Sequence, residues 1–228
     1  MNGWHVIIEN SDLFVRGFFT TLLILAFSAL FSIVLSIPFA FALNSNRAVL
    51  RIPAKAYTMT IRGFPALIQL FMVYYGLSQF DILRDSWMWR FFSSALFCTL
   101  LVFTLNTVAY TGEIFAGALH EIPRGEIEAG ASIGMSAWRL ALSVQIPLML
   151  RKSLPQYNNE IVLLLHATAL ASAVTLLDLT GAAQTISMEH YVMLEPYLCA
   201  AAIYFLLTAI LMRGFKFAER RWLAYLIK

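Results

Sequence analysis

The charged side chains that could do chemistry in this chain stand singly beside long apolar runs. Arg62 precedes one such run, and Glu160 precedes the seventeen uncharged residues of 161–177. An ionised group in hydrocarbon costs about 2.5–3.5 kcal/mol on insertion scales, so such residues usually face a partner or a cavity. A carboxylate in a transport path would favour a cationic ligand, and a guanidinium would act as an ion pair or a gate.

Both residues also have a purely structural interpretation. Arg62 could extend its aliphatic stem so that the guanidinium reaches the lipid headgroups. Glu160 could pair with Arg151 or Lys152, or accept backbone hydrogen bonds near Pro155. The residue types alone leave these alternatives open.

Two further polar stripes have helical spacing. Asn106, Tyr110 and Glu113 lie at positions i, i+4 and i+7, which places them on one face of a helix. The same spacing recurs in Thr168, Ser172 and Thr175. Such stripes form helix–helix hydrogen bonds, worth about 0.6 kcal/mol on average, more often than they line a path.

Composition places these residues in a membrane protein. Of the 228 residues, 60% are hydrophobic and 13% are charged, against about 45–50% and about 25% in soluble domains. These values, with a net charge of only +3, exclude a soluble enzyme, a disordered chain and a protein that binds nucleic acid through a basic surface. The two cysteines lie in separate apolar runs, and we find no residues with metal-ligand spacing.

The apolar runs predict the fold class. A bilayer core needs about 20 helical residues, and five helices fit, near 16–43, 56–79, 92–118, 155–177 and 191–213. Continuous runs favour helices over barrel strands, which are about ten residues long and alternate in polarity. We therefore expect an all-α polytopic membrane protein with five transmembrane helices in a single domain, 1–228.

Lysine and arginine predict the orientation. The segments on one side of the predicted spans carry twelve of these residues, and those on the other side carry three. Basic loops stay in the cytoplasm, so we expect an extracytoplasmic N-terminus and a cytoplasmic C-terminus. The tail, 213–228, mixes aromatic and basic residues and is predicted to lie along the cytoplasmic interface as an amphipathic helix.

One connection, 121–151, does not have the composition of a linker. It is too polar to span the membrane and too apolar to be a solvated loop. Pro123 and Gly125 precede a helix that begins at Glu126, Gly134 breaks it, and Ser136 can cap a second helix. This element either lies in the headgroups or docks on a cytoplasmic partner.

The spacing in this connection resembles the cytoplasmic motif of ABC importer permeases, which reads EAA, three residues, G, nine residues, I-x-L-P. The chain has Glu128-Ala129-Gly130, then Gly134, then 144–147 as VQIP, with the same spacings. It departs from the motif in having Gly130, Val144 and Ile146. The resemblance implies that the residues that couple the chain to an ATPase are Glu126, Glu128, Ala129, Gly130, Gly134, Ile146 and Pro147.

Three other stretches resemble the polar amino-acid permeases of this class. RGFPALIQLF at 62–71 is similar to their RGTPLLVQLF, with Phe64 in place of threonine, and similarity continues through 103–119 and 155–171. His166, where many members have lysine, resembles the M-type permease of histidine/lysine/arginine/ornithine importers. The candidate residues for a translocation path or gate are Arg62, Gln69, Asn106, Tyr110, Glu113, Asn159, Glu160, Thr168 and Ser172.

The resemblance implies a type I ABC importer permease bundle with a cytoplasmic coupling helix, in a bacterial inner membrane. Its partners would be two cytoplasmic ATPases, an external amino-acid-binding protein and a second, non-identical permease. The chain has no GxxxxGK[ST] loop, so we expect no catalysis and no bound cofactor, with ATP and Mg on the ATPases.

The implied substrates are basic amino acids such as histidine, arginine and lysine. Another polar amino acid or an opine is the alternative within this class. A secondary carrier and a non-transporting membrane scaffold are the alternatives from other classes. Carriers usually show internal repeats, which we do not find here, and a scaffold does not explain the spaced glycine motif.

Overall fold

The computed structural model describes residues 3–222, and within that range the chain is all-helical without a strand. The long helices are α2 (Ser11–Leu43), α7 (Ala95–His120), α10 (Ile146–Ala167) and α12 (Leu194–Trp222). The shorter α-helices are α1 (Gly3–Glu9), α3 (Ala48–Gly63), α4 (Ala66–Phe71), α5 (Asp81–Arg84), α6 (Trp89–Phe92), α8 (Arg124–Ser132), α9 (Ala137–Leu140) and α11 (Leu179–His190). Two π-helical segments, η1 (Met72–Gly76) and η3 (Ala141–Gln145), and two 3₁₀ segments, η2 (Leu77–Gln79) and η4 (Thr168–Val174), continue them.

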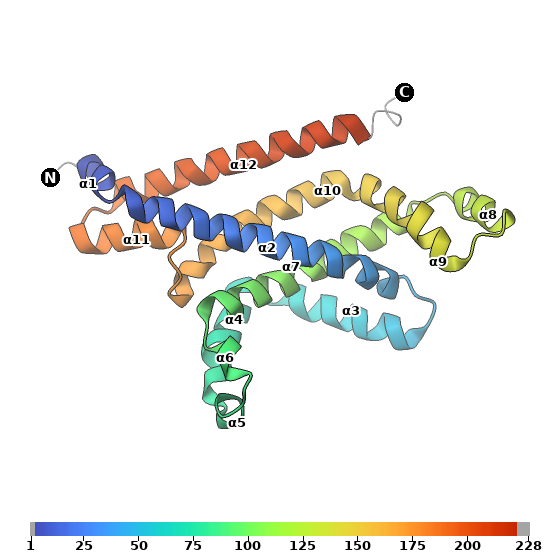
Figure 1. Cartoon of the computed structure of the whole chain (residues 1–228), viewed down its shortest axis with the longest axis horizontal. Coiled ribbons are helices and arrows are strands. Elements are labelled where there is room, and N and C mark those ends of the chain that lie inside the picture. Colours follow the sequence, from blue (N-terminus) through green and yellow to red (C-terminus); the bar gives the residue numbers. More distant parts are fainter. Residues whose placement is uncertain (1–2, 223–228) are drawn as a thin grey trace.

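The centre of the bundle is the contact between α2 and α7, with α10 packed against α7 (Figure 1). The buried face of α2 combines large apolar side chains with a series of small residues, which are Gly17, Thr21, Ser28, Ser32, Ser36 and Ala40. Small residues let helix backbones approach closely where no hydrophobic effect drives the association. On α7, a Cβ added to Gly112 would lie 2.5 Å from the Phe39 ring, so this glycine is required by the approach of α2.

The predicted second span, 56–79, is not one helix, and this corrects the sequence-based expectation. Phe64 is extended (φ −109°, ψ 138°) between α3 and Pro65, because a residue that precedes proline is forced out of the α conformation. The chain continues through α4, η1 and η2, and Figure 1 shows α4, α5 and α6 leaving the long axis of the bundle.

The described residues contain three helices long and apolar enough to cross a membrane, α2, α7 and α12. A fourth span is present if 137–174 and α11, which meet at a 43° bend, are counted together. The five predicted spans thus become three or four by this measure, because the second predicted span is interrupted at Pro65.

A buried aspartate organises the bend before α11. Thr175 has a left-handed conformation (φ 68°), and the Asp178 carboxylate then caps α11 by accepting from the backbone N–H of Gly181 at 2.9 Å and of Thr180 at 3.2 Å. The Tyr204 hydroxyl of α12 donates to the same carboxylate at 3.1 Å. The bend therefore joins α11 to α12 through the Asp178 carboxylate. Helix α11 was not predicted from the sequence.

The same bend is joined to α2. Thr21 accepts from the backbone N–H of Leu179 at 3.2 Å. A Cβ on Gly17 would lie 2.6 Å from the Asp178 carbonyl oxygen, so this end of the bundle needs glycine at that position.

The C-terminal segment extends the last long helix. Residues 213–222 belong to α12, which continues without a break to Trp222. The rest of the predicted amphipathic tail, 223–228, lies outside the described residues.

The two ends of the bundle carry different connections. The α2–α3 connection, α8 and the C-terminal end of α12 lie at one end, whereas α1 and α11 lie at the other (Figure 1). The connections that carry most of the lysine and arginine therefore share one end of the molecule.

Replacing Asp178 with alanine tests this arrangement. The buried donors of Thr180, Gly181 and Tyr204 would lose their acceptor, so Asp178→Ala should lower the free energy of unfolding by about 1–3 kcal/mol. Asp12→Ala is the control, because Asp12 is exposed and an exposed ion pair contributes about 1 kcal/mol at most. Thermal unfolding of the protein in detergent measures both, and equal midpoints for the two variants would contradict the assignment.

Candidate functional site

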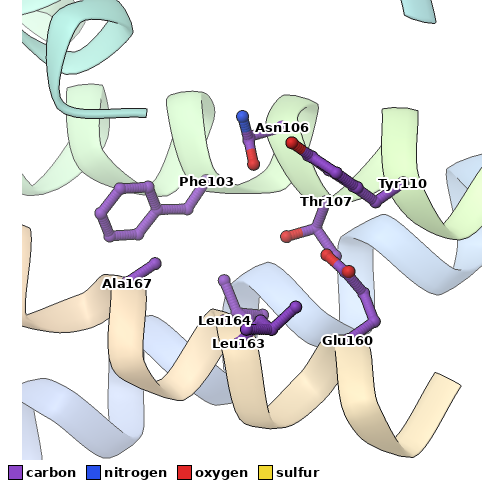
Figure 2. A pocket seen from close by; sticks show the side chains of 8 residues that line it. All are labelled: Phe103, Asn106, Thr107, Tyr110, Glu160, Leu163, Leu164 and Ala167. Carbon is purple, nitrogen blue, oxygen red and sulfur yellow. The ribbon is translucent and has the colours of Figure 1, made fainter. Parts of the chain in front are cut away.

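A cavity of about 190 Å³ lies between α7 and α10 (Figure 2). Its polar lining consists of Asn106, Thr107 and Tyr110 from α7 and Glu160 from α10. Figure 2 shows the Glu160 carboxylate extending from α10 toward Thr107 and Tyr110. Three of the predicted path residues, Asn106, Tyr110 and Glu160, are therefore brought together at one site.

Glu160 is buried, with 7% of its surface exposed, and its carboxylate faces this cavity. Within residues 3–222 it forms no ion pair within 4.0 Å and no hydrogen bond. Lys152, one of its suggested partners, instead donates to the Glu121 carbonyl at 2.6 Å. The nearby charge that acts on Glu160 is Arg62. A buried carboxylate without a direct partner is costly, which is the property expected of a site that takes up a cation.

The other end of the cavity is apolar. It consists of Phe103, Leu163, Leu164 and Ala167. On α10, the last three follow Glu160 at i+3, i+4 and i+7, so their place on its face could have been predicted from helical periodicity. The cavity thus offers one carboxylate and three neutral polar side chains at one end and hydrocarbon at the other.

Arg62 packs on an aromatic ring, with its guanidinium carbon 5.0 Å from the centre of the Tyr110 ring. This contact lies beside a second, more open cavity of about 680 Å³, which α3 and α7 line. Its charged lining residues are Lys55, Arg62 and Glu113. Tyr110 lines both cavities, so its side chain lies between the buried carboxylate and the open space.

Gln69 forms hydrogen bonds across the interruption between α3 and α4. Its Nε2 donates to the Ile61 carbonyl at 2.7 Å and to the Phe64 carbonyl at 2.8 Å, which satisfies acceptors that the interruption at Pro65 leaves free. Its Oε1 accepts from Asn106 Nδ2 at 3.3 Å. Gln69 is therefore a positioning residue that connects the end of α3 to the cavity wall.

The remaining predicted path residues lie outside the cavity lining. Asn159 is exposed. Thr168 donates to the Leu165 carbonyl at 2.6 Å and lies 3.5 Å from the Tyr204 hydroxyl, and Ser172 donates to the Ala169 carbonyl at 2.9 Å. Both hydroxyls thus donate to carbonyls three residues earlier in the chain, and that of Thr168 also lies near α12. His166 is hydrogen-bonded to Thr208 of α12 at 3.2 Å, as expected of a packed histidine.

The predicted coupling motif forms a compact helical hairpin at one end of the bundle (Figure 1). Helix α8 contains Glu126, Glu128, Ala129 and Gly130, and Gly134 follows it with φ +78°, a conformation that favours glycine. Ser136 then caps α9 by accepting from the backbone N–H of Arg139 at 3.3 Å.

Gly130, the departure from EAA, is buried where α8 packs on α9. A Cβ there would lie 2.5 Å from Leu140 Cδ1 and 3.3 Å from Met135 Sδ, which are ends of flexible side chains that can turn away. Glu126 and Glu128 are exposed on the same helix, whereas Ile146 and Pro147 begin α10 and are half-buried. The motif therefore has an exposed half on α8 and an anchored half on α10.

Comparison with known proteins gives the class to which this arrangement belongs. Residues 32–223 match the family described as binding-protein-dependent transport system inner membrane component. The chain belongs to this family of ABC importer permeases, which excludes a secondary carrier and a membrane scaffold.

Similar proteins indicate the kind of importer to which such a permease belongs. The chain is 40% identical over 195 residues to the octopine transport system permease protein OccM of Rhizobium radiobacter, covering 84% of this chain and 80% of that protein. It is 36% identical over 223 residues to the histidine/lysine/arginine/ornithine transport system permease protein HisM of Salmonella typhimurium, covering 97% and 95%. The crystal structure of an amino acid ABC transporter with histidines matches with a TM-score of 0.81 at 28% identity, covering 94% and 96%.

The chain is accordingly a permease component of an ABC importer for amino acids or opines, and an inner membrane component. Proteins of this kind are membrane transport components and not enzymes themselves, since the ATPase of such systems is separate. The transport systems of this family also depend on a binding protein.

Gln69→Leu tests the positioning role of this side chain. The variant leaves the Ile61 and Phe64 carbonyls without their donor, and we expect it to lower the free energy of unfolding by about 1–3 kcal/mol. Gln79→Leu is the matched control, because its bonds are longer, at 3.5 Å, and exposed. Unfolding midpoints in detergent compare the two, and a Gln69→Leu midpoint equal to that of Gln79→Leu would refute the role.

Proposed function

We propose that the chain carries amino acids with a cationic side chain through the membrane and that the cavity at Glu160 is part of the path. The observation that carries this proposal is the buried, unpaired Glu160 carboxylate facing a cavity. A cation that enters offsets the cost of this charge, whereas a neutral side chain leaves it unpaired.

The rest of the cavity suits the same substrates. Asn106, Thr107 and Tyr110 supply amide and hydroxyl groups near the carboxylate, and the wall of Phe103, Leu163 and Leu164 suits an aliphatic stem. The volume is far above the roughly 10–15 Å³ that one water needs. Lysine and arginine combine a methylene chain with a terminal cation, so they match both the apolar and the polar end of the cavity.

An opine is the second candidate cargo, favoured by the identity to OccM. Octopine contains the guanidinium group of arginine, so the same carboxylate would recognise it. A polar but neutral amino acid such as glutamine is less well supported, because it would not pair with Glu160.

We infer the assembly from the family and the position of α8. The exposed helix α8 would dock in a groove of a cytoplasmic ATPase, with two such ATPases carrying ATP and Mg, and an external binding protein would deliver the cargo. Closure of the ATPases would draw the coupling helices together and open the bundle outward. The whole chain, 1–228, acts in this proposal as one permease domain with its N-terminus outside and the α8 end in the cytoplasm.

A second, non-identical permease completes the proposed importer. Leu163 lines the cavity but is 51% exposed, so the cavity is not closed by this chain alone. The segment 72–91 also exposes large apolar side chains, among them Met72, Ile82 and Trp87. A related chain that covers these surfaces would complete the path between the two subunits.

Uptake of labelled lysine tests the role of the carboxylate. Glu160→Gln preserves size but removes the charge, and we expect uptake to fall about tenfold or more, which is what a lost interaction of about 1.4 kcal/mol gives. Glu160→Asp should retain part of the uptake. Asn159→Asp is a control, since Asn159 is exposed beside the cavity residue, and unchanged uptake by Glu160→Gln would dismiss the proposal.

Substitution at Gly134 tests the coupling role. Nothing lies within 4 Å of a Cβ at this position, so Gly134→Arg should insert into the membrane while its bulk abolishes docking and uptake. Gly134→Asn is the control, because asparagine tolerates the left-handed conformation. Normal uptake by Gly134→Arg at normal membrane levels would refute the docking assignment.

A further inference from the structure

The side chain of Tyr110 separates the two cavities. It lines the buried cavity with Glu160 and the open cavity with Lys55, Arg62 and Glu113. Figure 2 shows its ring extending from α7 across the space above Glu160 and Thr107, with the hydroxyl toward Asn106. A movement of this ring would therefore change the connection between the two spaces.

The open cavity lies on the coupling side of the buried one. Helix α7 leads at His120 into the connection before α8, so Glu113 is nearer to the coupling hairpin than Tyr110, and Phe103 is farther from it. A cargo that moves from the Glu160 cavity toward the coupling end would have to pass Tyr110.

Arg62 holds this ring from the open side. Its guanidinium carbon lies 5.0 Å from the ring centre, and its charge acts on Glu160. A guanidinium over an aromatic face is attracted by the electrons of the ring. Arg62 is thus attracted both to the Tyr110 ring and to the Glu160 carboxylate.

The backbone that carries Arg62 is fixed to α7. The Tyr57 hydroxyl donates to the Leu105 carbonyl at 2.6 Å, and Gln69 connects the end of α3 to Asn106. By contrast, nothing lies within 4 Å of a Cβ at Gly63. The arrangement lets the Arg62 side chain move into the open cavity without displacing its helix.

We propose that Arg62 and Tyr110 form a latch that closes the Glu160 cavity on its coupling side, and that a cationic cargo releases it by neutralising Glu160. The release step rests on the proposed function, because it requires a cationic cargo. The latch itself follows from the stacking and from the position of Tyr110 between the cavities.

The charges explain why release would be selective. With the cavity empty, Glu160 attracts Arg62 and the ring stays covered. A cation beside Glu160 cancels that attraction and repels Arg62, which then moves toward Glu113 and the open cavity and frees the ring. A neutral cargo leaves the attraction intact, so the latch would remain closed.

Cysteine labelling in the assembled importer tests the latch without any cargo. Ala167→Cys places a reporter in the buried cavity, opposite Glu160. Inside-out vesicles that contain the importer receive a membrane-impermeant maleimide, which reaches the chain from the coupling side. The chain without the introduced cysteine reports the background from Cys98 and Cys199.

We expect Arg62→Met and Tyr110→Ala to raise the labelling rate by roughly tenfold, since the loss of a cation–π contact shifts the closed population by about that factor. Glu160→Gln should raise it as well, because it imitates the neutralised carboxylate. The double variant Glu160→Gln/Arg62→Met should label no faster than Arg62→Met alone, since both changes open the same latch.

Two variants guard against loss of structure. Arg62→Lys keeps a cation over the ring and should label close to the parent rate. Arg51→Met is the matched control, because Arg51 is exposed on the same helix and lines neither cavity. Recovery of the intact complex from each variant shows that it is folded.

The outcomes separate the latch from the cargo. If Arg62→Met is labelled at the rate of the parent protein, the latch is wrong, even if the importer takes up lysine. If Arg62→Met is labelled fast but Glu160→Gln is labelled at the parent rate, release by neutralisation is wrong. Fast rates in both, in an importer that takes up no basic amino acid, would retain the latch and reject the proposed cargo.

Discussion

The cost of a charge in an apolar bundle is the constraint on which this structure depends. Glu160 is buried between two helices without a direct partner, and a protein retains such a residue only where it serves a purpose. Around it the chain arranges neutral polar groups from α7 and the charge of Arg62. The site is thus defined by a deficit of positive charge, which a cargo can supply.

Two other polar side chains in the bundle avoid the cost of burial by forming hydrogen bonds. Asp178 is fully buried, yet two backbone N–H groups and the Tyr204 hydroxyl donate to it, and its role is to join helices. Gln69 likewise satisfies the carbonyls freed by the break at Pro65. Asp178 and Gln69 thus use their hydrogen bonds to join helices, whereas Glu160 has no ion pair or hydrogen bond within residues 3–222 and faces a cavity.

Much of the fold could be predicted from the sequence because local rules decide it. The charge-free runs predicted α2, α7 and most of α12, and the glycine, proline and serine positions predicted the hairpin of α8 and α9. The coupling motif was identified by its spacing, and the family was confirmed. Asn106 and Tyr110 were predicted to share one helix face, because helical periodicity decides this, and both line the cavity.

What the sequence did not predict depends on contacts between distant segments. Apolar composition does not reveal that Pro65 ends a helix, because proline is tolerated in some membrane helices. Thr168 and Ser172 have the same spacing as the α7 stripe but face a different neighbour, and helix α11 depends on a cap at Asp178 that only the fold completes. Lys55, on another helix, joins the open cavity by tertiary packing alone.

Helix α10 connects the coupling motif directly to the Glu160 cavity. It begins with Ile146 and Pro147 of the motif and carries Glu160 fourteen residues farther along the same helix, a distance of about 21 Å at 1.5 Å per residue. The helix continues past Pro155 to Glu160, and over this length a tilt of about 5° displaces the far end of a helix by about 2 Å. The position of the charge in the cavity would then depend on the geometry at the coupling end, so the mechanical and the electrostatic parts of transport share one helix.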